Sequence, residues 1–236
     1  MWWAGRPLDV YLGTRAVAVC DGARLLAKSQ VVGVEEGLAH ACSLMASIDG
    51  AKRRGIALWL SGGLARPFML PRVAGVRSEA ERAQLVSAIA MERTGMAGAL
   101  RVWTDSGKGR DNIVAVAMQE SVLVNIHKAW PGFRFVRSVR PYWADVLRWS
   151  AAADPTPRAL SVQDCDCVTM VFGANRQIAA VSTMTGIEDR DGAEAVIART
   201  MVAVDLPANS TTAVWWSSRG AQPHAFALSP LAEVSK

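Results

Sequence analysis

Two short segments of this 236-residue chain combine glycine, hydroxyl and acidic side chains in patterns that could bind phosphate. Gly13-Thr14 follows an apolar run, and in the second half of the sequence Asp164 and Asp166 flank Cys165. Glycine in a turn lets the backbone approach a phosphate closely, and aspartate oxygens can hold the coordination shell of a Mg²⁺ ion. These residues are therefore the candidates for a nucleotide site.

A third glycine-containing segment, residues 106–111, reads Ser-Gly-Lys-Gly-Arg-Asp. It lacks the six-residue glycine-to-glycine spacing of a P-loop, and it precedes an expected strand, whereas a P-loop precedes a helix. We therefore expect a flexible loop here.

The cysteines and histidines do not form a metal-binding or catalytic pattern. Cys165 and Cys167 could be half of a metal site, but on a strand both thiols would share one face, and no second cysteine or histidine pair lies nearby. We expect buried or half-buried strand cysteines. His40, His127 and His224 are spread over three regions. Because neither a Ser/His/Asp set nor a carboxylate pair can be assembled, the sequence predicts no metal and no catalytic residue.

Composition and charge indicate a globular chain without a membrane-spanning segment. Hydrophobic residues make up 51% of the sequence, and no apolar run reaches the roughly 18–20 residues that cross a bilayer. Arg6 and Asp9 make the N-terminus too polar for a secretory signal. The net charge is +5, but the basic residues are scattered without a nucleic-acid-binding signature. We expect a soluble, cytoplasmic chain with no nucleic-acid partner, and a membrane helix after Lys236 is left open.

The first 60 residues predict the order β-β-β-α-β. Asp21-Gly22 is a strong hairpin turn. Apolar residues at three- and four-residue spacings predict a helix over 34–48, which would lead to a buried parallel strand. The expected strands are 8–12, 16–20, 24–32 and 56–60.

Residues 62–106 interrupt this pattern and predict a small inserted subdomain. Its helix begins at Ser78, with Glu81 completing a capping box, and continues to about Gly95. Its strands are expected at 68–70 and 100–104. The main pattern should then resume with a strand at 112–118, a helix at 120–130, a strand at 133–139 and a helix at 142–152, followed by a proline-bearing linker at 151–157.

The second half repeats the order of the first. Strands are expected at 159–162, 167–172, 177–184 and 212–216, with a long amphipathic helix at 188–204 before the last of them. The two copies are offset by about 150 residues. The sequence therefore predicts an α/β protein with a first lobe over 1–152, which carries the insertion, and a second lobe over 158–236.

A duplicated β-β-β-α-β-α plan with an insertion in the first copy resembles the ribonuclease H-like, actin-like ATPase superfamily. In that superfamily the first phosphate loop carries an Asp, a hydrophobic residue, Gly and Thr. Here Gly13 and Thr14 match, but Tyr11 stands at the Asp position. In the second loop, where Asp-x-Gly is expected, Asp164 is kept and Asp166 replaces the glycine. The resemblance implies a degenerate cleft that binds no cofactor or retains only vestigial ATP binding.

Within the superfamily, the chain length and the modest insertion look most like the cytoplasmic domain of GspL in type II secretion and like PilM in type IV pilus assembly. This resemblance implies a non-catalytic scaffold, cytoplasmic and peripheral to or anchored at the inner membrane. Its partner would be a secretion ATPase or the cytoplasmic tail of a bitopic platform protein, and a homodimer is left open. The alternative is a divergent ATPase or small-molecule kinase that uses Asp9 or Asp164 to hold Mg²⁺.

The nine tryptophans are many for a chain of this size. Trp2 and Trp3 form an aromatic pair near the N-terminus, and Trp143 and Trp149 lie on an expected helix. Large exposed aromatic side chains favour interfaces, so these four are candidates for a partner surface. Packing in the core or at sheet edges is the alternative interpretation.

Overall fold

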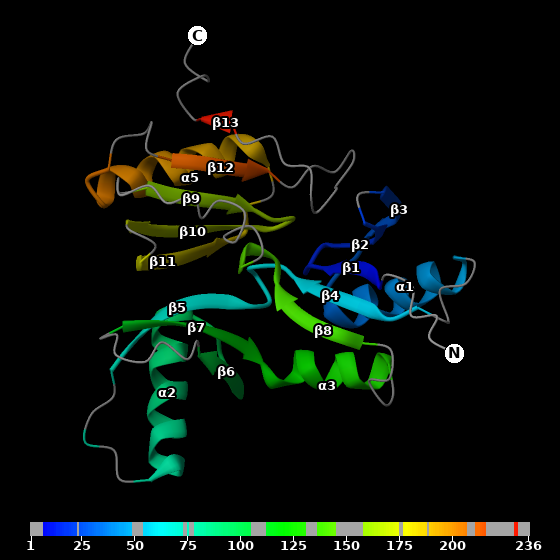
Figure 1. Ribbon diagram of the computed structural model, residues 1–236, viewed down its shortest axis with the longest axis horizontal. Coiled ribbons are helices and arrows are strands. Elements are labelled where there is room, and N and C mark those ends of the chain that lie inside the picture. The colour runs from blue at the N-terminus through cyan, green and yellow to red at the C-terminus, as the bar shows by residue number, and fades with distance from the viewer. Residues whose placement is uncertain are drawn as a thin grey trace.

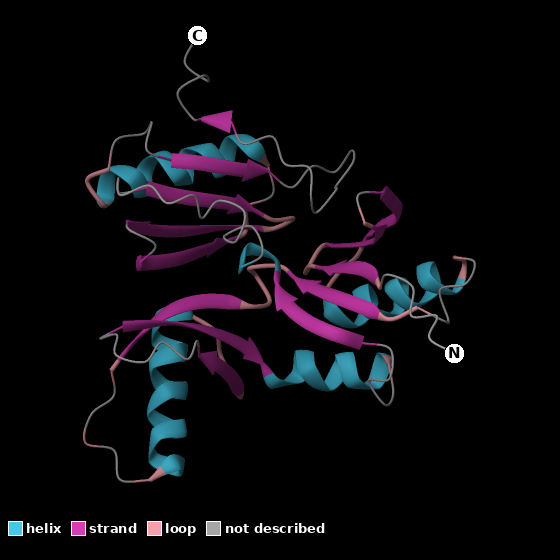
Figure 2. Ribbon diagram, in the orientation of Figure 1, coloured by secondary structure: helices cyan, strands magenta, loops and turns pink. Residues whose placement is uncertain are grey.

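Three β-sheets form the framework of the protein, and helices pack against them (Figure 1). The computed structural model describes residues 7–22, 24–48, 54–72, 75, 78–104, 112–130, 136–144, 158–174, 177–187, 189–206, 211–215 and 229–230. Two of the sheets have five strands each, and the third has three. Figure 2 shows the helices lying on the outer sides of these sheets.

The first five-stranded sheet has the strand order β3-β2-β1-β4-β8. The first three strands are antiparallel neighbours, whereas β4 runs parallel to β1 and β8 parallel to β4. Helices α1 and α3 cover its outer face. The elements of this lobe are β1 (Leu8–Leu12), β2 (Ala16–Asp21), β3 (Arg24–Gln30), α1 (Val34–Ala46), β4 (Ile56–Leu60), α3 (Glu120–Ala129) and β8 (Val136–Pro141).

Alternation along β1 explains why this strand is buried on both sides. Val10 and Leu12 face the helices and pack with Leu38 of α1 and Ile126 of α3. Tyr11 points to the opposite face and packs against residues of the second lobe. A strand covered on both faces is apolar nearly throughout, as the sequence predicted for the central parallel strands.

The three-stranded sheet has the order β5-β7-β6, with antiparallel pairing throughout. Its elements are β5 (Arg66–Pro71), α2 (Glu79–Thr94), β6 (Leu100–Thr104) and β7 (Asn112–Gln119). The strand expected at 112–118 forms as β7, but the expectation that it returns to the sheet of the first lobe is wrong. Strand β7 instead pairs with β5 and β6, the two strands that precede it in the chain, and it lies between them. The third sheet therefore extends to Gln119.

Helix α2 begins with the side-chain cap that the sequence predicted. The Ser78 hydroxyl accepts a hydrogen bond from the Glu81 backbone N–H at 3.1 Å, and Gly95 ends the helix in the left-handed conformation. Replacing Ser78 with alanine should lower the stability of the protein by about 1 kcal/mol, because that N–H then loses its partner. Chemical denaturation would measure the change, and Ser78→Asp should restore it; equal stability of Ser78→Ala and the unmodified protein would contradict the assignment.

The second five-stranded sheet has the order β11-β10-β9-β12-β13. Its first three strands in sequence are antiparallel neighbours and β12 runs parallel to β9, as β4 does to β1, but the fifth strand, β13, is antiparallel to β12. Ile197 and Met201 of α5 cover its outer face. The elements are β9 (Arg158–Gln163), β10 (Cys167–Ala174), β11 (Gln177–Thr185), α5 (Arg190–Ala203), β12 (Thr211–Trp215) and β13 (Ser229–Pro230).

Several sequence expectations fall outside the described residues. These are the loop at 106–111, the linker at 151–157, and Trp2, Trp3 and Trp149. Of the helix expected at 142–152, residues 142–144 are described and are helical. Within the described part of the chain, every helix is too short or too polar to cross a membrane.

Candidate functional site

The loop between β1 and β2 contacts the second lobe directly. Gly13 donates its N–H to the Ala16 carbonyl at 2.8 Å, and the carbonyl of Thr14 accepts the Gly33 N–H at 2.8 Å. A Cβ placed on Gly13 would overlap the Cys165 sulfur. Glycine is therefore required here because the opposite loop comes this close. In a nucleotide site, a glycine at this position would be required because a phosphate comes equally close.

Asp164 joins the two lobes through both of its carboxylate oxygens. It is 2% exposed. The Tyr11 hydroxyl donates to its Oδ1 at 3.0 Å, and the Gly62 N–H donates to its Oδ2 at 2.7 Å. Both donors belong to the first lobe, so the carboxylate is engaged by the protein itself at the position where the resemblance would place a Mg²⁺ ligand.

The segment around Cys165 is a tight turn between β9 and β10. The Asp164 N–H donates to the Cys167 carbonyl at 2.8 Å, which leaves Cys165 and Asp166 as the two turn residues. The expectation that Cys165 and Cys167 share one strand is therefore wrong, because only Cys167 lies on a strand. The expectation that they are buried or half-buried is confirmed, since Cys167 is buried and Cys165 is intermediate.

Asp166 takes the place of the glycine in the second loop and also lies against the first lobe. It is 6% exposed. A Cβ on Gly63 would approach its Oδ2 to 3.1 Å. A charged side chain thus occupies the space that the missing glycine would have left beside a phosphate. The structure brings three predicted site residues, Gly13, Asp164 and Asp166, to one contact between the lobes.

The close approach of the two loops predicts a strong effect of adding a single methyl group. Gly13→Ala should lower the free energy of unfolding by about 1–3 kcal/mol, because the new Cβ must displace Cys165. Cys165→Ala in the same chain should recover most of that loss, and a double-mutant cycle by urea denaturation measures the coupling. Additive effects of the two substitutions would contradict direct contact.

Aromatic side chains fill the space beside these loops. Tyr11 and Trp59 of the first lobe pack in one buried cluster with Tyr142 and Trp143 and with apolar residues of β9 and β10. The rings of Tyr11 and Tyr142 meet edge to face, with centroids 5.4 Å apart. Trp143 is 2% exposed and donates its indole N–H to the Ala65 carbonyl at 3.0 Å. The proposal of Trp143 as a partner surface is therefore wrong, because the residue lies between the lobes.

Burial alters the acidity of the groups at this contact. Removal from water raises the pKa of Asp164 to about 7, even though the hydrogen bonds from Gly62 and Tyr11 act in the opposite direction. Burial also raises the pKa of Asp166, although Arg15 and Arg66 lower it. Burial, together with the charge of Asp164, raises the pKa of the Tyr11 phenol. Asp164 is thus poised to exchange a proton near neutral pH.

Asp9, the other carboxylate considered for Mg²⁺, lies apart from this loop contact. It lies on β1 two residues before Tyr11, is 6% exposed and accepts a hydrogen bond from the Trp59 indole at 3.1 Å. Its Oδ2 has no hydrogen-bond partner among the described residues. Across the described part of the chain, no three acidic, cysteine or histidine side chains converge to form a metal-binding group.

Three residues of the site, Trp59, Gly62 and Gly63, were missed at the sequence level. Gly62 and Gly63 follow the buried strand β4. From the sequence alone, this pair was assigned to the start of the inserted subdomain, but two adjacent glycines can also indicate that another part of the chain comes close to the backbone. Trp59, one residue before the end of β4, alternates with Leu58 and Leu60 and so had to face away from the helices.

Comparison with known proteins identifies the fold. Neither a protein-family model nor a curated protein matches the sequence. A protein of unknown function with an actin-like ATPase fold from Bacteroides thetaiotaomicron matches with a TM-score of 0.60 and 9% identity, over 90% of this chain and 82% of that one. This likeness confirms the predicted actin-like fold.

Two further solved structures are similar to this chain. The PilM–PilN type IV pilus biogenesis complex matches with a TM-score of 0.49 and 14% identity, over 85% of this chain and 66% of that one. The cytoplasmic domain of EpsL, an inner membrane component of the type II secretion system of Vibrio cholerae, matches with a TM-score of 0.45 and 17% identity, over 75% and 70%.

Proposed function

We propose that this chain is a non-catalytic assembly scaffold that binds partner proteins in the inner-membrane platform of a type II secretion or type IV pilus machine. It would act on the cytoplasmic side of the inner membrane. The proposed class of machine is based on the sequence resemblance to GspL and PilM. The proposed lack of catalysis is based on the side chains that lie between the lobes.

The observation that supports this proposal is that protein side chains fill the position where the sequence resemblance would place a phosphate. The hydroxyl of Tyr11 is bonded to Asp164, and Cys165 lies against Gly13. A nucleotide phosphate would have to break these contacts and would meet two buried carboxylates, Asp164 and Asp166. Burying further negative charge beside them is costly without a compensating cation.

A rigid two-lobed body without nucleotide chemistry suits a scaffold. Hydrogen bonds from Tyr11 and Gly62 to Asp164, together with the aromatic cluster, hold the lobes in one arrangement. A partner surface on such a body is pre-organised, so binding does not have to order the protein first.

The proposal is tested by direct binding. The purified full chain would be titrated with the partners encoded by genes that neighbour its own: the cytoplasmic tails of bitopic membrane proteins and the ATPase domain. Sequence-scrambled tails would serve as controls. We expect at least one of the partners to bind, with an affinity unchanged by millimolar Mg–ATP. Failure of every platform component to bind would overturn the proposal.

A further inference from the structure

Strand β6 forms an open edge of the three-stranded sheet (Figure 1). That sheet has the order β5-β7-β6, and β5 is the strand that lies against β11 of the second lobe. Strand β6 therefore lies on the side of the sheet away from that lobe, and among the described elements its main contacts are with β7 and α2. An edge of this kind can pair with another chain unless the protein blocks it.

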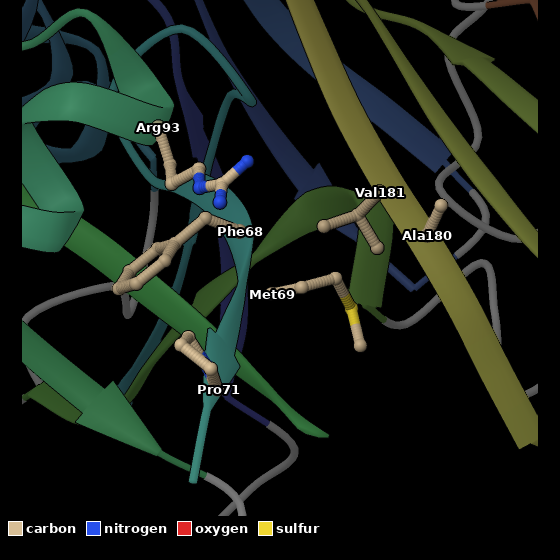
Figure 3. A pocket seen from close by; sticks show the side chains of 6 residues that line it. All are labelled: Phe68, Met69, Pro71, Arg93, Ala180 and Val181. Carbon is tan, nitrogen blue, oxygen red and sulfur yellow. The ribbon is translucent and has the colours of Figure 1, made fainter. Parts of the chain in front are cut away.

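The other strand edges in the described part of the chain are covered or blocked. The edges of β5 and β11 face each other, and Met69 and Val181 line the pocket of about 400 Å³ between them (Figure 3). Strands β3 and β8 each carry two basic residues, and the short strand β13 contains Pro230. Charged residues and proline are the usual blocks on a free edge, which leaves β6.

Strand β6 carries neither a proline nor an unpaired charge. Its sequence is LRVWT, and Arg101 is its one charged residue. The Arg101 guanidinium forms an ion pair with Glu120, the first residue of α3, at 3.1 Å. The charge is therefore balanced on the face of the sheet and does not oppose the approach of another strand.

The register of the sheet shows which backbone groups of β6 face outward. The Glu120 N–H donates to the Ala99 carbonyl, so the odd-numbered residues of β6 bond toward β7. Leu100, Val102 and Thr104 therefore direct their N–H and C=O groups to the outer edge. In the part of the chain that the structure describes, these outward groups have no hydrogen-bond partner.

An exposed tryptophan lies directly beside this edge. Val102 packs with the apolar cluster between the small sheet and α2, so Arg101 and Trp103 lie on the opposite face of the sheet. Trp103 is 46% exposed and is the largest of the exposed hydrophobic side chains that the structure describes. Tryptophan is enriched among the residues that anchor interfaces, so the open edge and this side chain together indicate an interaction surface.

We infer that β6 pairs antiparallel with β6 of a second copy of the chain, about a two-fold axis at Val102. The outward groups of Val102 would bond to those of Val102 in the second copy, and Leu100 would pair with Thr104. Trp103 of each copy would then lie opposite Arg101 of the other. The result is one continuous sheet across two copies.

The residues of β6 are complementary to one another in this register. Opposed residues in a non-hydrogen-bonded antiparallel pair have Cα atoms about 4.5 Å apart, so the Arg101 guanidinium can lie over the Trp103 ring of the other copy. Glu120 of its own copy balances the charge of each arginine. An axis at Arg101 would place two arginines opposite each other, and an axis at Trp103 would leave Leu100 without a partner in β6.

The helices leave room for this pairing. Helix α2 contacts both β5 and β6, so it lies across the middle strand, β7. In the joined sheet the two copies of β7 would be three strand spacings apart, or about 14 Å. Packed helices approach to about 8–10 Å, so the two copies of α2 would not collide.

The small size of the contact predicts a weak dimer. It is limited to one strand and its neighbouring side chains in each copy, which places it below the roughly 1,200 Å² of a stable interface. We therefore expect a monomer at low protein concentration, where the contact does not affect the free energy of unfolding.

Sedimentation equilibrium of the purified full chain over a range of concentrations is the first test. We expect a reversible equilibrium between monomer and dimer, with a dissociation constant in the micromolar range. Sedimentation as a monomer alone at hundreds of micromolar protein would overturn the inference.

Two matched pairs of variants assign the dimer to β6. Thr104→Pro removes an outward N–H without breaking the ladder to β7, so it should raise the dissociation constant at least tenfold, whereas Thr104→Val should not. Trp103→Ala should weaken the dimer several-fold, and Trp103→Tyr should retain most of it. Thermal unfolding at low protein concentration checks that each variant is folded. Equal dissociation constants for Thr104→Pro and Thr104→Val would place the contact elsewhere and refute the pairing.

Disulfide trapping tests the register. Alanine replaces Cys42 and Cys165, the two cysteines that are not fully buried, and Arg101→Cys is introduced in one chain and Trp103→Cys in another. In the proposed register the two new thiols are opposed, with Cα atoms about 4.5 Å apart, a separation that a disulfide can span. The mixed dimer also keeps one contact between tryptophan and arginine. We expect it to exceed both symmetric dimers under mild oxidation, and a predominance of either symmetric dimer would refute the axis at Val102.

The inference goes beyond the proposed function and does not depend on it. A chain that dimerises through β6 but binds no platform component would refute the scaffold role and leave the dimer intact. A chain that stays monomeric, and whose binding of a platform component is lost in the Thr104→Pro variant, would show that a partner segment occupies the edge. That outcome would refute the second copy and leave the scaffold role intact.

Discussion

Replacing Trp143 with alanine should lower the free energy of unfolding by about 3–5 kcal/mol. The side chain is 2% exposed and packs with aromatic and apolar residues of both lobes. Its loss would leave a cavity in this cluster and would remove the donor to the Ala65 carbonyl. Urea denaturation followed by circular dichroism would measure the change.

Two other tryptophan substitutions serve as controls. Trp143→Phe keeps an aromatic ring without the indole N–H and should show an intermediate loss. Trp103, which is 46% exposed on β6, should tolerate alanine with a change of about 0.5 kcal/mol. A loss below about 1 kcal/mol for Trp143→Ala would show that the aromatic cluster does not hold the lobes together.

Asp164 should make the stability of the protein fall as the pH rises from about 4 to about 7. Burial raises the pKa of Asp164 to about 7, so within this range the folded state holds a proton that the unfolded state has released. Raising the pH therefore favours unfolding until the folded carboxyl also ionises, and the stabilisation is present in full only below the pKa of the unfolded chain.

The contribution of this one carboxyl can be isolated with Asp164→Asn, which keeps the shape and an acceptor for one of the two donors. The stability of the variant relative to the unmodified protein should increase across that pH range by an amount on the order of 4 kcal/mol. Chemical denaturation at a series of pH values measures it. A difference between the two proteins that does not change with pH would contradict the assignment.

Much of the fold follows from local patterns that can be recognised in the sequence. The continuous apolar run of β4, the turn at Gly22 and the cap at Ser78 each predict an element through a local physical rule, and each element forms. The boundaries moved by a few residues where cross-strand pairing extends a strand, as for β5, which continues to Pro71. Which sheet a strand joins was not predictable, because β7 has the same alternation that a strand of the main sheet would have.

The candidate site, too, was predictable in part from the sequence and depended in part on how the lobes pack. The departures from a phosphate loop at Tyr11 and Asp166 are visible in the sequence, but their consequence is not. That the Tyr11 hydroxyl reaches Asp164, 153 residues away in the chain, depends on how the lobes pack. Trp143 was expected at a surface because helical spacing alone does not show that its face of the helix meets the second lobe.

Isothermal titration calorimetry tests the central claim most directly. The full chain would be titrated with ATP in the presence and in the absence of Mg²⁺. The claim is that side chains of the chain itself occupy the phosphate position between the lobes. We predict no saturable heat up to millimolar nucleotide, with or without Mg²⁺. A saturable, Mg²⁺-dependent binding isotherm that disappears in the Asp164→Asn variant would contradict it.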